Sequence, residues 1–193
     1  MLAGGQSRRM GTDKAGLEIV SREHGVTTIS RLVLRVLGEV FPEVLVIGGD
    51  PLSGEGWRQC ADLFPGGGAL GGIYTALQQA RHEYVFVAAC DMPFLLPGAA
   101  VALLELAAGH DVTVPVLDGR AQTLHAVYRK TCAAPALALL ESGRRRIVDF
   151  YPDVDVREVP AADFARIDPG GQSMRNVNTP ADLVRARAEI GGE

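Results

Sequence analysis

Apolar residues recur along this chain in two alternating patterns. Short apolar runs, rich in β-branched and aromatic side chains, stand at residues 44–47 and 84–89. Such runs are typical of strands buried on both faces, as in a parallel sheet. The stretch before the first run has helical spacing instead, with Thr28 suited to the N-cap, and its apolar positions are Ile29, Leu32, Val33, Val36, Leu37 and Val40.

The same alternation continues to the end of the chain. We expect helices over residues 70–77, 97–106, 133–140 and 180–190, with Thr179 capping the last. Strands are expected at 112–114, 124–128 and 154–159, with a turn at 117–119. Repeated strand–helix–strand units predict an α/β protein: a three-layer α/β/α sandwich around a Rossmann-like, mostly parallel sheet. In such sheets, ligands bind at the carboxyl ends of the strands.

Composition narrows the class of protein. The chain has 193 residues, 47% of them hydrophobic, and a net charge of −4. We expect one domain over residues 1–193, and the acidic balance argues against a nucleic-acid surface. Three scattered cysteines without metal spacing fit a reducing compartment. Because no signal peptide or membrane-length apolar run is visible, a cytoplasmic protein without membrane contact is expected.

The opening loop, residues 2–14, combines small residues with cationic ones. Gly4 and Gly5 permit close backbone approach to a ligand, and Arg9 and Lys14 suit phosphate oxygens. The loop therefore predicts a phosphate site, with a plain surface turn as the alternative. A loop of this type leaves a sheet strand, yet only Met1 precedes Leu2. We accordingly expect that the recorded start lies too late or that the chain was shortened.

Three further segments carry candidate chemistry. Asp91 follows the most apolar run. A carboxylate there suits Mg²⁺ that is also bound by substrate phosphates, and the alternative is that Asp91 is the N-cap of the next helix. Residues 62–72 are glycine-rich, and Asp62 could accept hydrogen bonds from a nucleoside, unless the segment is only a flexible loop. Asn176 and Asn178 suit a polar heterocycle, a phosphate or an Asx turn.

Other polar residues carry weaker signals. The arginines at 144–146 form either a solvated helix end or a phosphate contact. The four histidines show no metal spacing, so we interpret them as structural or surface residues, although His125 belongs to a strand that could border the site.

The opening loop, the 62–72 segment, the 90–93 segment and the 176–180 segment occur in one order. With them the chain closely resembles the molybdenum cofactor guanylyltransferases, within the nucleotidyltransferase superfamily. These enzymes join GMP from GTP to molybdopterin, giving molybdopterin guanine dinucleotide and pyrophosphate. The resemblance implies the nucleotide-diphospho-sugar transferase fold, with nucleotide bound by residues of about 1–95 and acceptor by residues of about 96–193.

The resemblance also implies individual roles and partners. Arg9, Lys14 and Asp91 would be catalytic, and Asp91 would hold Mg²⁺. Asn176 and Asn178 would bind the acceptor. GTP and molybdopterin would be the substrates, with transient contact to molybdoenzymes or other cofactor-biosynthesis proteins. The nucleotide would be bound by seven residues: Leu2, Ala3, Gly4, Gly5, Lys14, Asp62 and Asp91.

Two departures and two rival functions accompany this interpretation. Residues 48–50 replace a polar nucleotide contact of the family, and residues 18–26 depart from its usual Leu-x-Gly-x-Pro pattern. One rival is a molybdopterin cytidylyltransferase or another small-molecule nucleotidyltransferase. The other is a nucleotide-binding protein without turnover. Pyrophosphate release from GTP and from CTP would separate the first rival from the main hypothesis.

Overall fold

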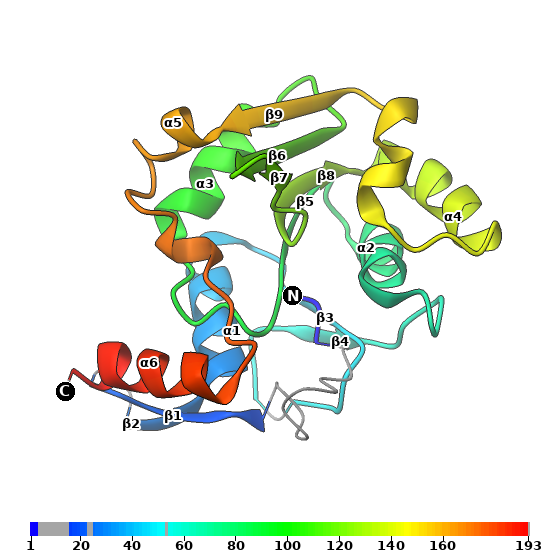
Figure 1. The fold of residues 1–193 in the computed structure, drawn as a ribbon. Coiled ribbons are helices and arrows are strands. Elements are labelled where there is room, and N and C mark those ends of the chain that lie inside the picture. Colours follow the sequence, from blue (N-terminus) through cyan, green and yellow to red (C-terminus); the bar gives the residue numbers. More distant parts are fainter. Residues whose placement is uncertain (4–15, 23–24, 53, 193) are drawn as a thin grey trace.

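A seven-membered sheet runs through the centre of the protein. The computed structural model describes residues 1–3, 16–22, 25–52 and 54–192. Residues 1–3 join two sheets into one, because Leu2 bridges in parallel to Ile47 on one side and to Ala89 on the other. The resulting order is β4 (Arg58–Cys60), β3 (Leu45–Ile47), residues 1–3, β5 (Tyr84–Ala88), β8 (His125–Arg129), β6 (Val112–Leu117) and β9 (Val156–Pro160) (Figure 1).

Strand direction confirms a mostly parallel sheet. β3 pairs in parallel with β4, and β6 pairs in parallel with β9. β8 is antiparallel to both β5 and β6, so those two neighbours run in the same direction. β8 follows β6 through a hairpin, and this short connection forces the reversal. A two-residue strand, β7 (Arg120–Ala121), extends the hairpin, whose turn places Asp118 and Gly119 at φ values of 49° and 68°.

Residues 1–3 are the strand from which the opening loop leaves the sheet. The Leu2 N–H donates to the Ala88 carbonyl at 2.9 Å, and the Ala3 N–H donates to the Ile47 carbonyl at 2.9 Å. The Met1 amino group donates to the Leu45 carbonyl at 2.7 Å. Burial lowers the pKa of that amino group to about 5, because the charged form loses its hydration. Residues 1–3 therefore occupy a strand position between β3 and β5.

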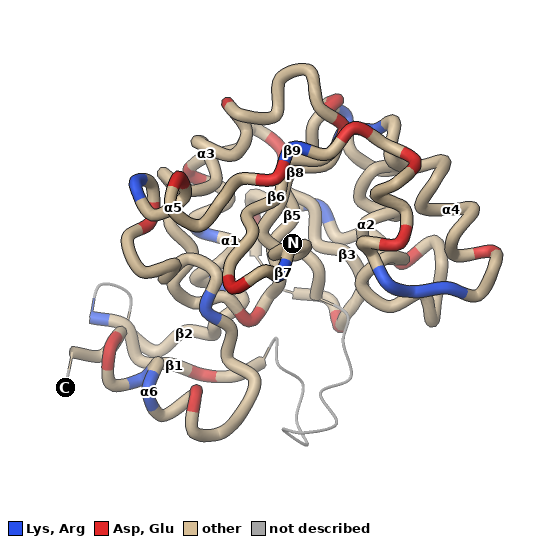
Figure 2. Tube along the Cα trace, turned by 45° about the horizontal axis from the view of Figure 1, so that its top comes forward, with Lys and Arg blue, Asp and Glu red and all other residues tan. Residues whose placement is uncertain are grey.

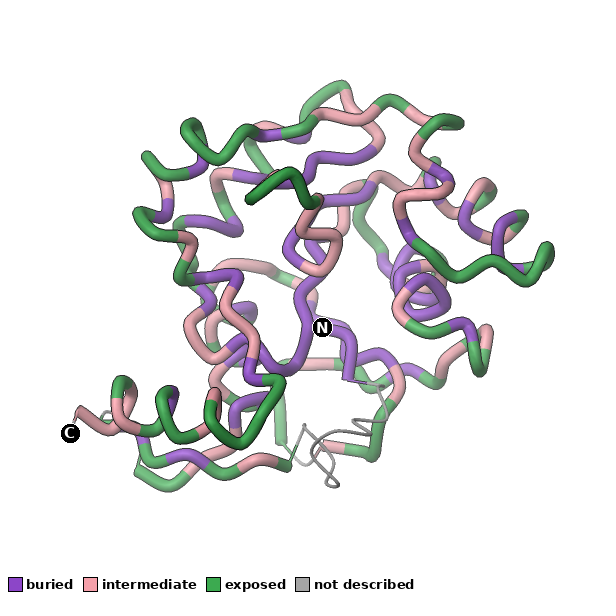
Figure 3. Tube along the Cα trace, viewed as in Figure 1, coloured by how far each residue is buried: buried purple, intermediate pink, exposed green. Residues whose placement is uncertain are grey.

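Two helical layers cover the sheet, one on each face. α1 (Ile29–Val40) and α3 (Pro97–Leu106) pack together on one face, and α2 (Gly68–Gln79) and α4 (Ala133–Glu141) pack on the other (Figure 1). Side chains alternate accordingly, since Val46 joins the first core cluster whereas Leu45 and Ile47 join the second. The buried strands lie between these layers (Figure 3). The predicted three-layer sandwich is confirmed.

Helix ends follow the local sequence. Thr28 caps α1 by accepting a hydrogen bond from the Arg31 N–H, as predicted. Thr179 and Asp182 form a capping box at the start of α6 (Pro180–Gly191). Short helical segments complete the described chain: η2 (Lys130–Cys132), η3 (Ile147–Asp153), α5 (Ala161–Phe164) and η4 (Gln172–Met174).

A hairpin of β1 (Glu18–Ser21) and β2 (Gly25–Thr28) was not predicted from the sequence. It lies beside α6, far along the chain, and its Ile19 joins a small core with Val177 and Ala186 (Figure 1). Only one face of β1 is buried, and β2 has no fully buried residue, so the apolar pattern there was too weak to indicate strands.

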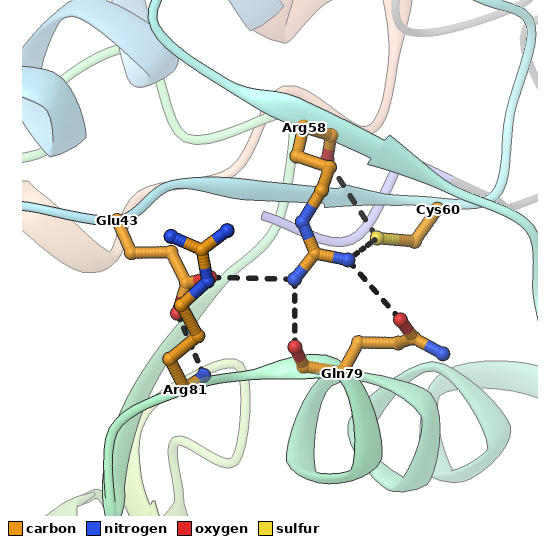
Figure 4. Close-up of polar contacts among 5 residues, drawn as sticks. All are labelled: Glu43, Arg58, Cys60, Gln79 and Arg81. Carbon is orange, nitrogen blue, oxygen red and sulfur yellow. Dashed lines mark hydrogen bonds and ion pairs between the residues drawn. The ribbon is translucent and has the colours of Figure 1, made fainter.

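The edge strand β4 is fixed to α2 by Arg58. Its guanidinium donates to the Gln79 carbonyl at 2.7 Å and to the Gln79 side chain at 3.1 Å, and it pairs with Glu43 at 3.3 Å (Figure 4). Glu43 also accepts from the Arg81 N–H at 2.8 Å. Desolvation raises the pKa of Glu43, but the hydrogen bonds and positive charges of Arg81 and Arg58 together outweigh it and hold that pKa below its usual value. The cluster therefore closes the carboxyl end of α2, where a cation is favourable.

No helix in the described part of the chain is long and apolar enough to span a bilayer.

Candidate active site

The carboxyl ends of β3, residues 1–3 and β5 meet at one edge of the sheet. The Cys90 N–H donates to the Leu2 carbonyl at 3.1 Å, which holds the segment after β5 beside the start of the opening loop. On the other side, Gly49 lies against Ala3. A Cβ at Gly49 would come within 2.9 Å of the Ala3 carbonyl oxygen, and the glycine has φ of 69°. A glycine suits this position because both the close approach to Ala3 and the positive φ disfavour a side chain.

The opening loop itself lies mostly outside the described residues. Gly4, Gly5, Arg9 and Lys14 all belong to the segment 4–15 that is not described. Leu2 and Ala3 are described, and both side chains are buried. The Leu2 side chain packs on α2, where a Cβ at Gly72 would meet it at 3.1 Å. Neither side chain is therefore offered to a ligand. The two backbone N–H groups are already hydrogen-bonded within the sheet, so any backbone contact from these residues would use a carbonyl oxygen.

Asp91 stands at the end of β5, at the same edge of the sheet. It is 6% exposed, and its carbonyl accepts a hydrogen bond from the Val177 N–H at 2.9 Å. This bond brings Asp91 beside the segment of Asn176 and Asn178, which lies far from it along the chain. The alternative role as cap of the next helix is wrong, because the N-cap of α3 is Leu96.

The side chains near Asp91 indicate what kind of metal ion this site could hold. Among the residues that the structure describes, no group of three or more acidic, histidine or cysteine side chains could hold an ion. A lone carboxylate is nevertheless what Mg²⁺ uses when substrate phosphates and water supply its other ligands. Asp91 therefore fits a cation that arrives with a nucleotide, and not a permanent structural metal.

The glycine-rich segment leads into α2 in a fixed conformation. Asp62 Oδ1 accepts from the Phe64 N–H at 3.0 Å and from the Thr75 hydroxyl at 2.9 Å. Gly66 and Gly68 have φ of 81° and 61°, in the left-handed region. This argues against a merely flexible loop. The N-cap residue of α2 makes no side-chain cap, so the first amides of the helix can receive an anionic or carbonyl oxygen.

The three consecutive arginines at 144–146 follow α4 as one basic stretch (Figure 2). Two of them have clearly different partners. Arg144 pairs with Asp149 at 2.9 Å. Arg145 donates to the Gly66 carbonyl at 3.3 Å and to the Leu140 carbonyl at 2.7 Å, and its guanidinium carbon lies 5.4 Å from the centre of the Phe64 ring. Arg145 thus contacts the glycine-rich segment. This contact could not be predicted from the sequence, because three consecutive arginines carry no signal that distinguishes one from another.

The Asn176–Asn178 segment borders a small polar pocket of about 250 Å³, lined by Phe94, Arg175, Asn176, Val177, Asp182 and Arg185. Arg175 lies 4.3 Å above the Phe94 ring and pairs with Glu189 at 2.8 Å. Asp182 accepts hydrogen bonds from the Asn178 and Thr179 N–H groups. The pKa of Asp182 is lowered to about 2, first by hydrogen bonding with the Thr179 side chain and then by hydrogen bonds from the Asn178 N–H and the Arg185 guanidinium.

A buried polar chain supports this segment from behind. Asp168 accepts hydrogen bonds from the Gln172 N–H at 3.0 Å, the Ser173 N–H at 2.8 Å and the Ser173 hydroxyl at 2.6 Å. The Ser173 hydroxyl also lies 3.4 Å from Nε2 of His125. His125 is a core residue, so its interpretation as structural is confirmed. Asp168 and Ser173 were missed, because isolated polar residues in a loop carry no pattern.

An apolar cavity of about 380 Å³ lies at the opposite end of the sheet. It is lined by residues at the start of β5, including Tyr84 and Val85, and by Leu45 and Met1. The glycine-rich segment and Asp91 stand at the other ends of these strands. The cavity is therefore not part of the candidate site.

Comparison with known proteins decides the family. The model of a MobA-like NTP transferase domain matches residues 1–156. The chain belongs to the MobA-like NTP transferase family. It is therefore a nucleotidyltransferase, and the resemblance seen in the sequence is confirmed.

Relatives match along nearly their full length. A probable molybdenum cofactor guanylyltransferase of Pelotomaculum thermopropionicum is 42% identical, with 97% of this chain and 90% of that protein covered. A molybdenum cofactor guanylyltransferase of Desulfosudis oleivorans is 33% identical, with 98% and 94% covered.

Solved structures agree with the fold. Molybdopterin-guanine dinucleotide biosynthesis protein A from Archaeoglobus fulgidus superposes with a TM-score of 0.83 at 26% identity, covering 100% of this chain and 97% of that one. A 2-C-methyl-D-erythritol 4-phosphate cytidylyltransferase from Thermus thermophilus superposes with a TM-score of 0.70 at 19% identity, covering 94% and 95%. The second match speaks to the fold alone, which is that of the nucleotidyltransferases.

Proposed function

We propose that this protein transfers GMP from GTP to molybdopterin, forming molybdopterin guanine dinucleotide and releasing pyrophosphate, with Mg²⁺ as cofactor. One observation carries the proposal: the Asp91 backbone is hydrogen-bonded to the Asn176–Asn178 segment at the sheet edge where the opening loop begins. Two polar segments thus meet at one strand end, as a reaction between two substrates requires. The names of the relatives at 42% and 33% identity supply the substrate pair.

On the nucleotide side, the proposal assigns backbone contacts to Leu2, Ala3, Gly4 and Gly5. Asp62 and the start of α2 would receive the nucleoside. Because Oδ1 of Asp62 already accepts hydrogen bonds from Phe64 and Thr75, the base would be read by the outer carboxylate oxygen and by nearby backbone groups. An acceptor of this kind suits the N–H donors of a guanine edge.

Charge neutralisation is the central chemical task. The acceptor phosphate is a monoester and largely dianionic near neutral pH, so it needs no strong base. Two polyanions must instead be brought in line. Lys14 and Arg9 are proposed to stabilise the departing pyrophosphate. Asp91 would hold Mg²⁺, which when bound offsets charge on the nucleotide phosphates.

On the acceptor side, Asn176 and Asn178 are proposed to bind molybdopterin. Asn176 is half-buried and lines the small polar pocket, whereas Asn178 is exposed at the start of α6. Side-chain amides both donate and accept, which suits a pterin ring. Molybdoenzymes or other cofactor-biosynthesis proteins would then take the product by transient contact, and a cytoplasmic location fits this chemistry.

The test is mass spectrometry of the product after incubation with molybdopterin, Mg²⁺ and either GTP or CTP. The proposal predicts the guanine dinucleotide and pyrophosphate from GTP, and little product from CTP. Asp91→Asn should lower turnover by about a hundred- to a thousandfold, because one charge-stabilising group is lost. Glu105→Gln, an exposed carboxylate on α3, is the matched control and should behave as wild type. Product from CTP alone would contradict the proposal.

A further inference from the structure

We propose that Arg145 is a positioning residue for the nucleotide site, holding residues 62–68 of the glycine-rich segment in place from the side of α4. This inference rests on the proposed function and deepens it, because it assigns the geometry of the nucleoside subsite to a residue outside the strand ends. Arg145 would contact neither substrate. It would act on the nucleotide through Phe64 and Gly66.

Arg145 joins two separate parts of the chain with one guanidinium. Nη1 donates to the Leu140 carbonyl at 2.7 Å and to the Arg144 carbonyl at 2.8 Å, which fixes it at the carboxyl end of α4. Nε donates to the Gly66 carbonyl at 3.3 Å, and the guanidinium carbon lies 5.4 Å from the centre of the Phe64 ring. A planar group with several donors can make all these contacts together, whereas a lysine ammonium cannot.

The segment needs support on that side. Its inner side is already held, since Asp62 accepts from Phe64 and from Thr75 of α2. Gly66 and Gly68 have left-handed backbones, and a Cβ on either would meet nothing within 4 Å. The two glycines therefore have open space beside them, and little side-chain packing can order them. The hydrogen bond from Arg145 to Gly66 supplies an anchor directly before the start of α2.

Close packing around Gly67 couples the position of residues 64–66 to the first turn of α2. A Cβ at Gly67 would lie 2.9 Å from the Phe64 carbonyl oxygen, 2.9 Å from the Gly71 Cα and 3.0 Å from the Leu140 side chain. The Gly67 N–H donates to the Phe64 carbonyl at 2.9 Å. A shift of Phe64 or Gly66 therefore moves the first turn of α2. Since proposed nucleoside contacts lie there, displacement weakens GTP binding while the acceptor segment at 176–178 stays in place.

The experiment compares Arg145→Ala and Arg145→Lys with Arg144→Ala. Arg144 is the matched control because it is adjacent, equally charged, and paired with Asp149 instead of the loop. Arg145→Ala should raise the KM for GTP about ten- to a hundredfold, as small misplacements of substrate-binding groups do. The KM for molybdopterin should stay within about twofold of wild type, a split that general destabilisation would not produce. Arg145→Lys should fall between, and Arg144→Ala should match wild type.

The outcomes separate the two proposals. Wild-type protein that makes no product from GTP overturns the proposed function, and this inference with it. Active wild type with an unchanged KM for GTP in Arg145→Ala overturns the inference alone, as does an equal rise in both KM values. If Arg145→Ala does not fold, the test uses Arg145→Lys and Phe64→Leu, because each removes part of the contact between Arg145 and residues 64–66. Either variant must then raise the KM for GTP selectively, or the inference is wrong.

Discussion

Protonation of His125 should destabilise the protein, and the effect can be isolated. The imidazole is fully buried, with its ring edge-to-face with Phe86 and Phe164 at centroid distances of 5.2 Å and 5.9 Å. The Ser173 hydroxyl donates to Asp168, so it accepts from His125 Nε2. Nδ1 has no hydrogen-bond partner among the described residues. Protonation therefore creates a buried cationic donor with nothing to accept from it.

The magnitude follows from the pKa of this group. Burial lowers the pKa of His125 from 6.5 to about 4, and the charge of Asp168 offsets only part of that shift. Because the folded-state pKa is the lower one, the stabilising contribution is fully present above about pH 6.5, is lost progressively as the pH falls from there, and is gone below about pH 4. The full loss is about 3 kcal/mol, and about 2 kcal/mol of it is reached near pH 5.

The assay is urea unfolding of wild type and His125→Gln near pH 7.5 and near pH 5, followed by circular dichroism and by Trp57 fluorescence. Wild type should lose about 2 kcal/mol more than the variant between the two conditions. Groups that titrate in both proteins, such as the Met1 amino group with its pKa of about 5, cancel in the difference. Equal losses in the two proteins would refute the reasoning, because the buried imidazole would then carry no cost of protonation.

Three further changes probe the fold and the site. Gly49→Ala should cost about 1–3 kcal/mol in urea unfolding, since φ is 69° and the new Cβ would press on Ala3; an unchanged midpoint would contradict this. Thr28→Ala should cost about 1 kcal/mol through loss of the α1 cap, against no loss in Arg35→Ala as control. Chelation by EDTA should abolish turnover and leave the melting temperature unchanged, because Asp91 fits a substrate-borne ion; a fall in melting temperature would indicate a structural metal instead.

Much of the fold could be predicted from the sequence because the core strands and helices have strong local patterns of apolar residues. The apolar runs at 44–47 and 84–89 are buried strands, and the helical stripe after Thr28 is α1. Strand direction was harder. The reversal of β8 comes from a hairpin within the second half, and β1 packs against α6, which follows it by about 160 residues. Such distant partners leave no local trace.

The candidate site was predicted only in part. The position of Asp91 followed from the rule that ligands bind at strand ends. Contacts between residues far apart in the sequence were not predicted. Examples are the hydrogen bonds from Val177 to Asp91 and from Arg145 to Gly66. The roles of Arg9 and Lys14 stay predictions, as do the single domain and the acceptor contacts of Asn176 and Asn178.

A crystal structure with a non-hydrolysable GTP analogue and Mg²⁺ tests the central claim most directly. The account predicts the phosphates against the opening loop, guanine beside Asp62, and the ion about 2.1 Å from a carboxylate oxygen of Asp91. Nucleotide bound at another place, with neither Asp91 nor the start of α2 in contact, would contradict it.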